Sequence, residues 1–141
     1  MELKWEKRME LGIPSIDSQH KNLVEMCSKA FEWAKDLEDG IDYYDQINEM
    51  LSEIIDYTQY HFSYEEELMN KYDFDRKTEH EFEHKFFVKK LNKLSNKDYD
   101  EPEEQKEFVN NLSQFLFDWL VHHIMDTDKK YVNFLKEYDV S

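Results

Sequence analysis

Residues 14–40 read PSIDSQHKNLVEMCSKAFEWAKDLEDG, and this stretch decides the fold class. Seven residues in it recur at alternating intervals of four and three positions: Ile16, His20, Leu23, Cys27, Ala30, Ala34 and Leu37. This spacing places all of them on one face of an α-helix. Ser15 is a candidate N-cap, and Gly40 follows where a C-terminal cap is expected. The stretch therefore predicts a helix over residues 15–39.

Three further stretches show the same alternation of intervals. We expect helices over residues 42–70, 76–95 and 102–125, followed by a short helical tail over residues 128–138. A corner is expected at residues 72–75 and a polar connection at residues 95–101, and Pro102 suits the first turn of the next helix. Four helices of about 20 residues joined by short loops predict an all-α fold. The expected architecture is an antiparallel up-down-up-down four-helix bundle, in a single domain spanning residues 1–141.

The composition supports one helical domain. The 141 residues include two Gly and two Pro, too few turn-forming residues for a β-sandwich or a doubly wound sheet. Hydrophobic residues make up 40% and aromatic residues 16% of the chain, which excludes intrinsic disorder despite the high charge. A chain of this length buries roughly two-thirds of its unfolded surface, so a core can form without disulfides.

The charge and the cysteine content indicate where the protein works. A net charge of −15 argues against nucleic acid and anionic membrane surfaces as partners, because like charges repel. The N-terminus lacks the apolar run of a signal peptide, and no segment is long enough to span a membrane. Cys27 is the single cysteine, which excludes an internal disulfide and suits a reducing compartment. We therefore expect a cytoplasmic protein. The expected oligomeric state is a monomer.

Most of the histidines fall on the predicted inward faces of the helices. Five of the six do so, together with one glutamate: His20, His61, His80, His84, His123 and Glu65. A buried polar side chain is costly unless it has a partner. One such histidine could be a core residue bonded to a backbone carbonyl, but five on all four helices favour a metal centre. Imidazole-rich sites suit Zn, Cu, Fe or Ni, and the donors exceed the four of one tetrahedral site, which favours two metal ions.

Two other metal motifs compete for the same residues. His80 and His84 with Glu81 match the H-E-x-x-H pattern of zinc metalloproteases, but this reading leaves the other candidate ligands unexplained. A ferritin-like di-iron site requires two Glu-x-x-His motifs. Glu81 to His84 supplies one, while Asp17 to His20 is only an approximate second. Neither motif accounts for so many histidines.

Taken in order, these residues resemble the hemerythrin family in its single-domain bacterial form. The matching segments are Ile16 to Leu23, His61 to Glu66, His80 to His84 with three residues between the histidines, and Trp119 to Tyr131. Their order and spacing agree from Trp5 to Tyr131. No single segment is decisive, but the ordered set is highly specific.

The resemblance implies a non-haem di-iron centre that binds dioxygen reversibly, for transport, storage or delivery. One iron would be held by His80, His84 and His123, the other by His20 and His61, with Glu65, Asp128 and an oxo or hydroxo group as bridges. Counting ligands leaves one position open on the iron with two histidines. The matching apolar pocket over that position consists of Phe62, Trp119, Leu120 and Ile124. A dry pocket of this kind favours release of intact dioxygen.

The resemblance leaves open functions other than reversible dioxygen binding. The same centre could belong to an enzyme that reduces peroxide or nitric oxide, whereas we expect a binding protein that is not an enzyme. It could also belong to an oxygen or iron sensor, which would need an output module. For the binding protein, an oxygen-consuming enzyme is a further candidate partner.

The end of the fourth helix poses a separate question. In a straight helix, the carboxylate nearest in phase to His123 is Asp126, whereas Asp128 falls well off that face. The family pattern, a histidine followed by an aspartate five residues later, selects Asp128. Following the family requires the helix to end or distort between Ile124 and Asp128, for instance by a π-type bulge. His122 is then a surface or supporting residue.

Overall fold

Helices occupy the stretches in which the sequence repeats apolar residues at helical intervals. The computed structural model of the chain describes residues 4–95, 99–138 and 140, and these residues contain no β-strand. The long helices are α1 (Pro14–Asp36), α2 (Tyr44–Lys71), α3 (Lys77–Ser95) and α4 (Pro102–His122). The shorter elements are the 3₁₀-helix η1 (Lys7–Met9), the π-helix η2 (His123–Asp128) and α5 (Lys129–Leu135).

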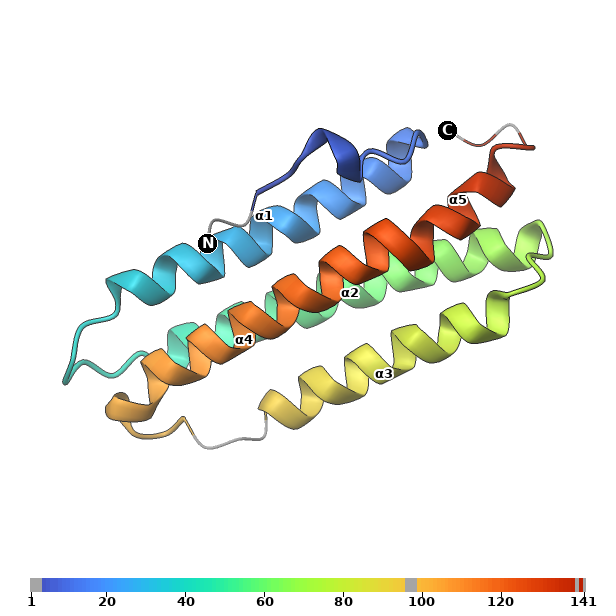
Figure 1. The fold of residues 1–141 in the computed structure, drawn as a ribbon. Helices are drawn as coiled ribbons and strands as arrows, with labels where there is room; N and C mark the ends of the chain where they lie inside the picture. The colour runs from blue at the N-terminus through green and yellow to red at the C-terminus, as the bar shows by residue number, and fades with distance from the viewer. Residues whose placement is uncertain (1–3, 96–98, 139, 141) are drawn as a thin grey trace.

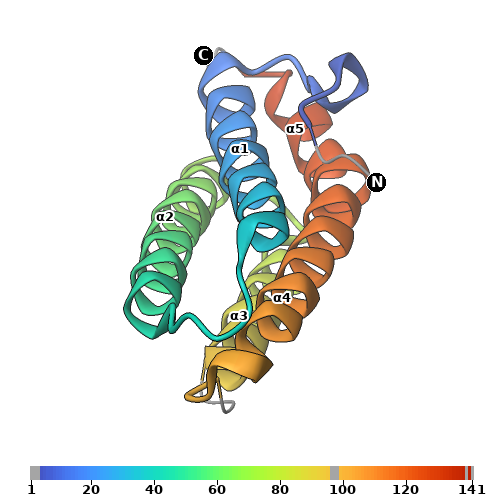
Figure 2. The same ribbon diagram turned by 90° about the vertical axis from the view of Figure 1, so that its left-hand side faces the viewer.

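The four long helices run alternately up and down and pack side by side (Figure 1). α1 packs against α4 and α2, and α2 packs against α3. α5 continues the line of α4 beyond the π-helix (Figure 1), and the segment before α1 lies near the same end of the bundle (Figure 2). The expected all-α four-helix bundle with a helical C-terminal tail is therefore confirmed. None of the described helices is both long enough and apolar enough to cross a membrane.

The first helix ends differently from the sequence expectation. Pro14 occupies its first turn, so Ser15 lies inside the helix and is not the N-cap. The helix stops at Asp36 because Leu37 turns to an extended conformation and is buried in the core. Gly40 lies beyond that point with φ of +83°, where it serves the loop and does not cap the helix. Within the polar connection expected at residues 95–101, residues 96–98 lie outside the described residues.

The fourth helix changes its winding where the family pattern requires a distortion. Pro102 begins α4 as predicted, and the α-helical hydrogen bonding gives way at His123 to a π-helix that runs to Asp128. The flanking backbone stays in the right-handed helical region, so α5 follows without a break. The predicted distortion is confirmed, and the helix does not stop at residue 125.

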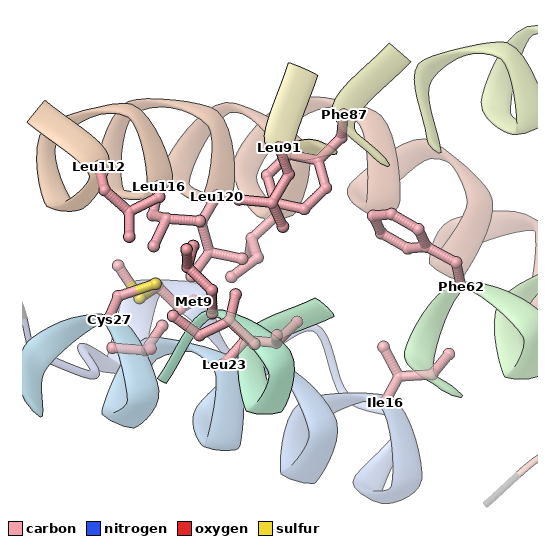
Figure 3. Close-up of a cluster of buried hydrophobic side chains, with 14 of the residues drawn as sticks. Met9, Ile16, Leu23, Cys27, Phe62, Phe87, Leu91, Leu112, Leu116 and Leu120 are labelled. Atoms are coloured by element: carbon pink, nitrogen blue, oxygen red, sulfur yellow. The ribbon is translucent and has the colours of Figure 1, made fainter. Parts of the chain in front are cut away.

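The part of the core between α1 and α4 that Figure 3 shows is mainly apolar. Leu112, Leu116 and Leu120 of α4 face Leu23 and Cys27 of α1 (Figure 3). Burying each leucine stabilises the fold by about 1.5–3 kcal/mol. Burial raises the pKa of the Cys27 thiol to about 12, so this cysteine stays protonated and acts as a small core residue. This apolar packing holds the helices that carry the polar cluster described next.

Candidate metal centre

Seven polar side chains converge inside the bundle, and each is at most 3% exposed. They are His20 of α1, His61 and Glu65 of α2, His80 and His84 of α3, and His123 and Asp128 of η2. Their possible ligand atoms form two overlapping groups, and within each group the atoms lie within 4.8 Å of one another. One group holds His20 and His61 and the other His80 and His84, whereas Glu65, His123 and Asp128 belong to both. The structure thus brings together all seven ligands that the family resemblance implies.

The two oxygens of Asp128 face different histidines. Oδ2 lies 2.6 Å from His20 Nε2 and 2.7 Å from His123 Nε2. Oδ1 lies 2.9 Å from His80 Nε2. A carboxylate placed between two sets of imidazoles in this way can bridge two cations.

Glu65 contacts the histidines in a similar way. Its Oε1 lies 2.9 Å from His61 Nε2, 3.3 Å from His123 Nε2 and 3.4 Å from His84 Nε2. Its Oε2 lies 3.9 Å from His80 Nε2. Glu65 therefore also contacts histidines of both groups.

The orientation of these atoms fits a metal better than hydrogen bonding. His20 Nε2 and Asp128 Oδ2 lie 2.6 Å apart, and His80 Nε2 and Asp128 Oδ1 lie 2.9 Å apart, but none of these atoms makes a hydrogen bond with a described residue. Each buried polar atom without a partner costs about 1–3 kcal/mol. Several of them together would use up much of a net stability of about 5–15 kcal/mol. Cations between the nitrogens and oxygens would satisfy them all.

Three of the histidines are held from outside the cluster by other side chains. His61 Nδ1 lies 2.7 Å from Gln19 Oε1, His84 Nδ1 lies 3.3 Å from Glu66 Oε1, and His123 Nδ1 lies 3.4 Å from Glu83 Oε1. Thr127 donates a hydrogen bond of 2.8 Å to Glu83 in turn. An Nδ1–H donor at each ring turns Nε2 toward the centre with a free lone pair, as metal-binding histidines require.

Sequence reasoning missed these outer partners. Gln19, Glu66 and Glu83 each sit one position from a predicted ligand, on either side of the inward face. The helical period assigns such positions to the flanks of the helix, where polar residues are ordinary. Adjacency to a ligand is the one signal that could have identified them.

The charges inside the cluster are strongly coupled. Burial alone would raise the pKa of Glu65, but the imidazoles of His61, His123 and His84 hold it well below its ordinary value. Burial likewise lowers the pKa of His123, but the carboxylates of Asp128 and Glu65 outweigh it and raise that pKa well above its ordinary value. In the metal-free protein, a proton on His123 therefore provides positive charge that a metal ion would otherwise supply.

Tyr131 borders the cluster as well. Its ring meets that of His80 edge to face, with centroids 5.3 Å apart, and its side chain is fully buried. Burial, together with the nearby Glu65 and Asp128 carboxylates, raises the pKa of the phenol. The hydroxyl therefore stays protonated beside the two carboxylates.

Two of the four residues proposed for an apolar pocket stack on histidines of the cluster. Phe62 stacks on His84 with centroids 3.8 Å apart, and Trp119 stacks on His123 at 4.5 Å. Leu120 and Ile124 are buried. Phe87, which the sequence analysis did not propose for the pocket, extends the aromatic cover. Its ring centroid lies 4.0 Å from that of Trp119.

The competing candidates lie elsewhere. His122 and Asp126 are exposed and 3.8 Å apart, so the straight-helix pairing points to solvent, and His122 is a surface residue as predicted. Asp17 accepts hydrogen bonds from the backbone N–H groups of Leu11 and Gly12 at 2.8 and 3.1 Å. It anchors the segment before α1 and does not supply a second Glu-x-x-His-like ligand.

Comparison with known proteins gives a consistent picture. The Hemerythrin HHE cation binding domain profile matches residues 11–135. Bacteriohemerythrin of Clostridium acetobutylicum is 31% identical over 129 residues, which cover 92% of this chain and 98% of that protein. Bacteriohemerythrin of Pseudomonas aeruginosa is 30% identical over 132 residues, covering 93% of this chain and 80% of that protein. The hemerythrin-like protein of Naegleria gruberi is 28% identical over 127 residues, covering 90% and 88%. With its buried histidine and carboxylate cluster on a four-helix bundle, this chain belongs to the hemerythrin family.

Proposed function

We propose that this protein binds dioxygen reversibly at a pair of iron ions and is not an enzyme. The observation that carries the proposal is the sharing of Glu65 and Asp128 between two groups of histidines. Two shared carboxylates suit two neighbouring cations, and imidazole donors suit iron. We further propose that the protein is a cytoplasmic monomer and that an oxygen-consuming enzyme receives the gas.

Each residue of the cluster has a proposed role toward the metal pair. His80, His84 and His123 would hold one iron, and His20 and His61 would hold the other. His123 lies within reach of both groups of ligand atoms. Glu65 and Asp128 would be shared between the two ions. When bound, the iron pair supplies the dioxygen-binding chemistry. Gln19, Glu66 and Glu83 fix the ring orientations that keep the ligand nitrogens directed inward.

The apolar residues around the cluster have a protective role in this proposal. Phe62, Trp119, Leu120 and Ile124 bring no acidic group to the site and exclude water from it. Exclusion of water and protons favours release of dioxygen intact over cleavage of its O–O bond.

An optical spectrum of the purified protein tests the function. We expect about two irons per chain by metal analysis, since two ligand groups are present, and a colour that appears in air and disappears on deoxygenation. A native stoichiometry near one, or zinc as the native metal, would refute the iron pair. Sustained consumption of peroxide or nitric oxide with a reductant would instead identify an enzyme.

Removing the apolar cover should shorten the life of the oxygen-binding state. In Trp119→Ala and Leu120→Ala we expect oxidation to the diferric form to be several-fold faster, because water and protons gain access. The decay of the oxygenated spectrum in air measures this rate. Val121→Ala is the matched control, because Val121 directly follows Leu120 and is half-buried. Equal decay rates in all variants would place the shield elsewhere.

Iron binding should weaken as the pH falls from about 8 to about 6. Because the pKa of His123 is raised well above its ordinary value, iron must displace a proton that an unperturbed imidazole would already have lost. Each displaced proton costs about 1.4 kcal/mol, or tenfold in affinity, per pH unit below that pKa. Chelator competition at several pH values measures the slope. A flat profile over this range would contradict the protonation of His123.

A further inference from the structure

The chain carries a basic segment that its net charge conceals. Residues 84–97 contain no Asp or Glu, although these two types supply 33 of the 141 residues, and they hold five of the 18 Lys and Arg residues. Four of these lysines belong to the described part of α3 and are exposed: Lys85, Lys89, Lys90 and Lys93. None of the four forms an ion pair with another described residue. On a protein of net charge −15, this patch has the opposite sign to its surroundings.

Two exposed phenylalanines of α3 lie at the start of this basic segment. Phe82 is 71% exposed and Phe86 is 54% exposed, and they lie one turn apart on α3. The helical period puts both on the side of α3 opposite the inward-facing His84. Phe86 neighbours Lys85, Lys89 and Lys90, whereas Phe82 lies between Glu81 and Glu83, at the acidic edge of the patch. Single exposed apolar residues are ordinary, but an exposed aromatic pair at the edge of a basic patch is typical of an interaction surface. We call Phe82, Phe86 and the four lysines the basic–aromatic face.

This face adjoins the metal cluster through a groove between α2 and α3. The groove has a volume of about 610 Å³ and is lined by Lys85 and Lys89 as well as by Phe62 and His84. The His84 ring presents Nδ1 to Glu66, a half-buried side chain that also lines the groove, and Nε2 to Glu65 in the cluster. One imidazole ring thus separates the groove from the proposed iron pair.

We propose that the basic–aromatic face docks an acidic electron-donor protein that returns oxidised iron to the ferrous state. The proposal rests on the proposed function, because a ferrous oxygen-binding centre that has oxidised stays inactive until it is reduced. Each ferric ion gains one electron and the donor loses one, so two electrons are needed per chain. Charge complementarity steers an acidic partner to this basic patch, and the phenylalanines add apolar area to a small contact. Electron-transfer complexes are of this small, weak kind.

The first measurement is reduction of the diferric protein under anaerobic conditions. The probe is reduced flavodoxin, an acidic one-electron donor, and a small uncharged quinol is the comparison reductant. In Lys85→Glu/Lys89→Glu we expect reduction by flavodoxin to slow by at least about tenfold, with a weaker dependence on salt, while reduction by the quinol is unchanged. Lys21→Glu/Lys29→Glu, at two exposed positions of α1, makes the same charge change elsewhere. Flavodoxin should reduce this control variant at close to the wild-type rate.

The second measurement is binding itself, by fluorescence anisotropy of labelled flavodoxin with the iron-loaded protein. Affinity should fall in Lys85→Glu/Lys89→Glu and in Phe82→Ser/Phe86→Ser, but not in the α1 control. Equal affinity and equal reduction rates in all variants would overturn the proposal. The proposal would also be overturned if the face variants kept the wild-type rate of reduction by flavodoxin but lost self-association or binding to anionic vesicles. The oxygenated spectrum of each variant separates the two proposals, because a failed docking test with normal oxygen binding refutes only the docking.

Discussion

Replacing Glu65 with alanine should remove iron from both positions of the site at once. Its carboxylate contacts His61 on one side of the cluster and His84 on the other, so its loss removes a ligand from each ion. Loss of a residue that merely orients a ligand weakens metal binding about 10–100-fold, and loss of a shared ligand should exceed that range. Metal analysis after purification should find well below one iron per chain.

The same substitution should destabilise the protein without metal. The lowered pKa of Glu65 and the raised pKa of His123 show that each charge stabilises the other in the buried cluster. Removing one partner of a buried ion pair costs about 3–5 kcal/mol, because the remaining charge has no compensation. Glu67→Ala, at an exposed position of the same helix, is the control and should keep both iron and stability. Full iron content in Glu65→Ala would rule out the bridging role.

Most of the candidate ligands could be placed inside the bundle from the sequence, because helical phase is a property of the sequence alone. His20, His61 and Glu65 continue the apolar series of their helices, and the structure buries all three completely. The outer partners could not be predicted in this way. Glu66 and Glu83 lie beside the inward face, and only the packing of two helices brings them to the ligand rings.

The helix ends were also beyond the sequence signals. Gly40 marks a turn correctly, since its φ is positive, but the helix stops at Asp36 because Leu37 is drawn into the core. Tertiary burial therefore overrides the local capping preference. The lysines of the basic–aromatic face are visible in the sequence as a stretch without acidic residues, but its link to the cluster depends on the groove between α2 and α3.

The π-helix explains why helical phase fails for the last ligand. In an α-helix, residues three or four apart share a face, which would pair His123 with Asp126. In a π-helix the hydrogen bonds join residues five apart, so Asp128 comes round to the side of His123. The two side chains lie 2.7 Å apart, whereas Asp126 points outward and pairs with His122 and Lys130.

Asp128→Ala should therefore lose iron, while Asp126→Ala should keep it. Asp128 contacts histidines of both groups through its two oxygens, so its removal should weaken binding of both ions by more than the roughly 10–100-fold of an orienting residue. Asp126 is exposed and forms only pairs longer than 3.5 Å, which in solvent are worth about 0–1 kcal/mol. Iron content and the oxygenated spectrum of the two variants, measured side by side, decide the matter. The reverse result would mean that the helix is α-helical through residue 128 in the iron-loaded protein and that Asp126 is the ligand.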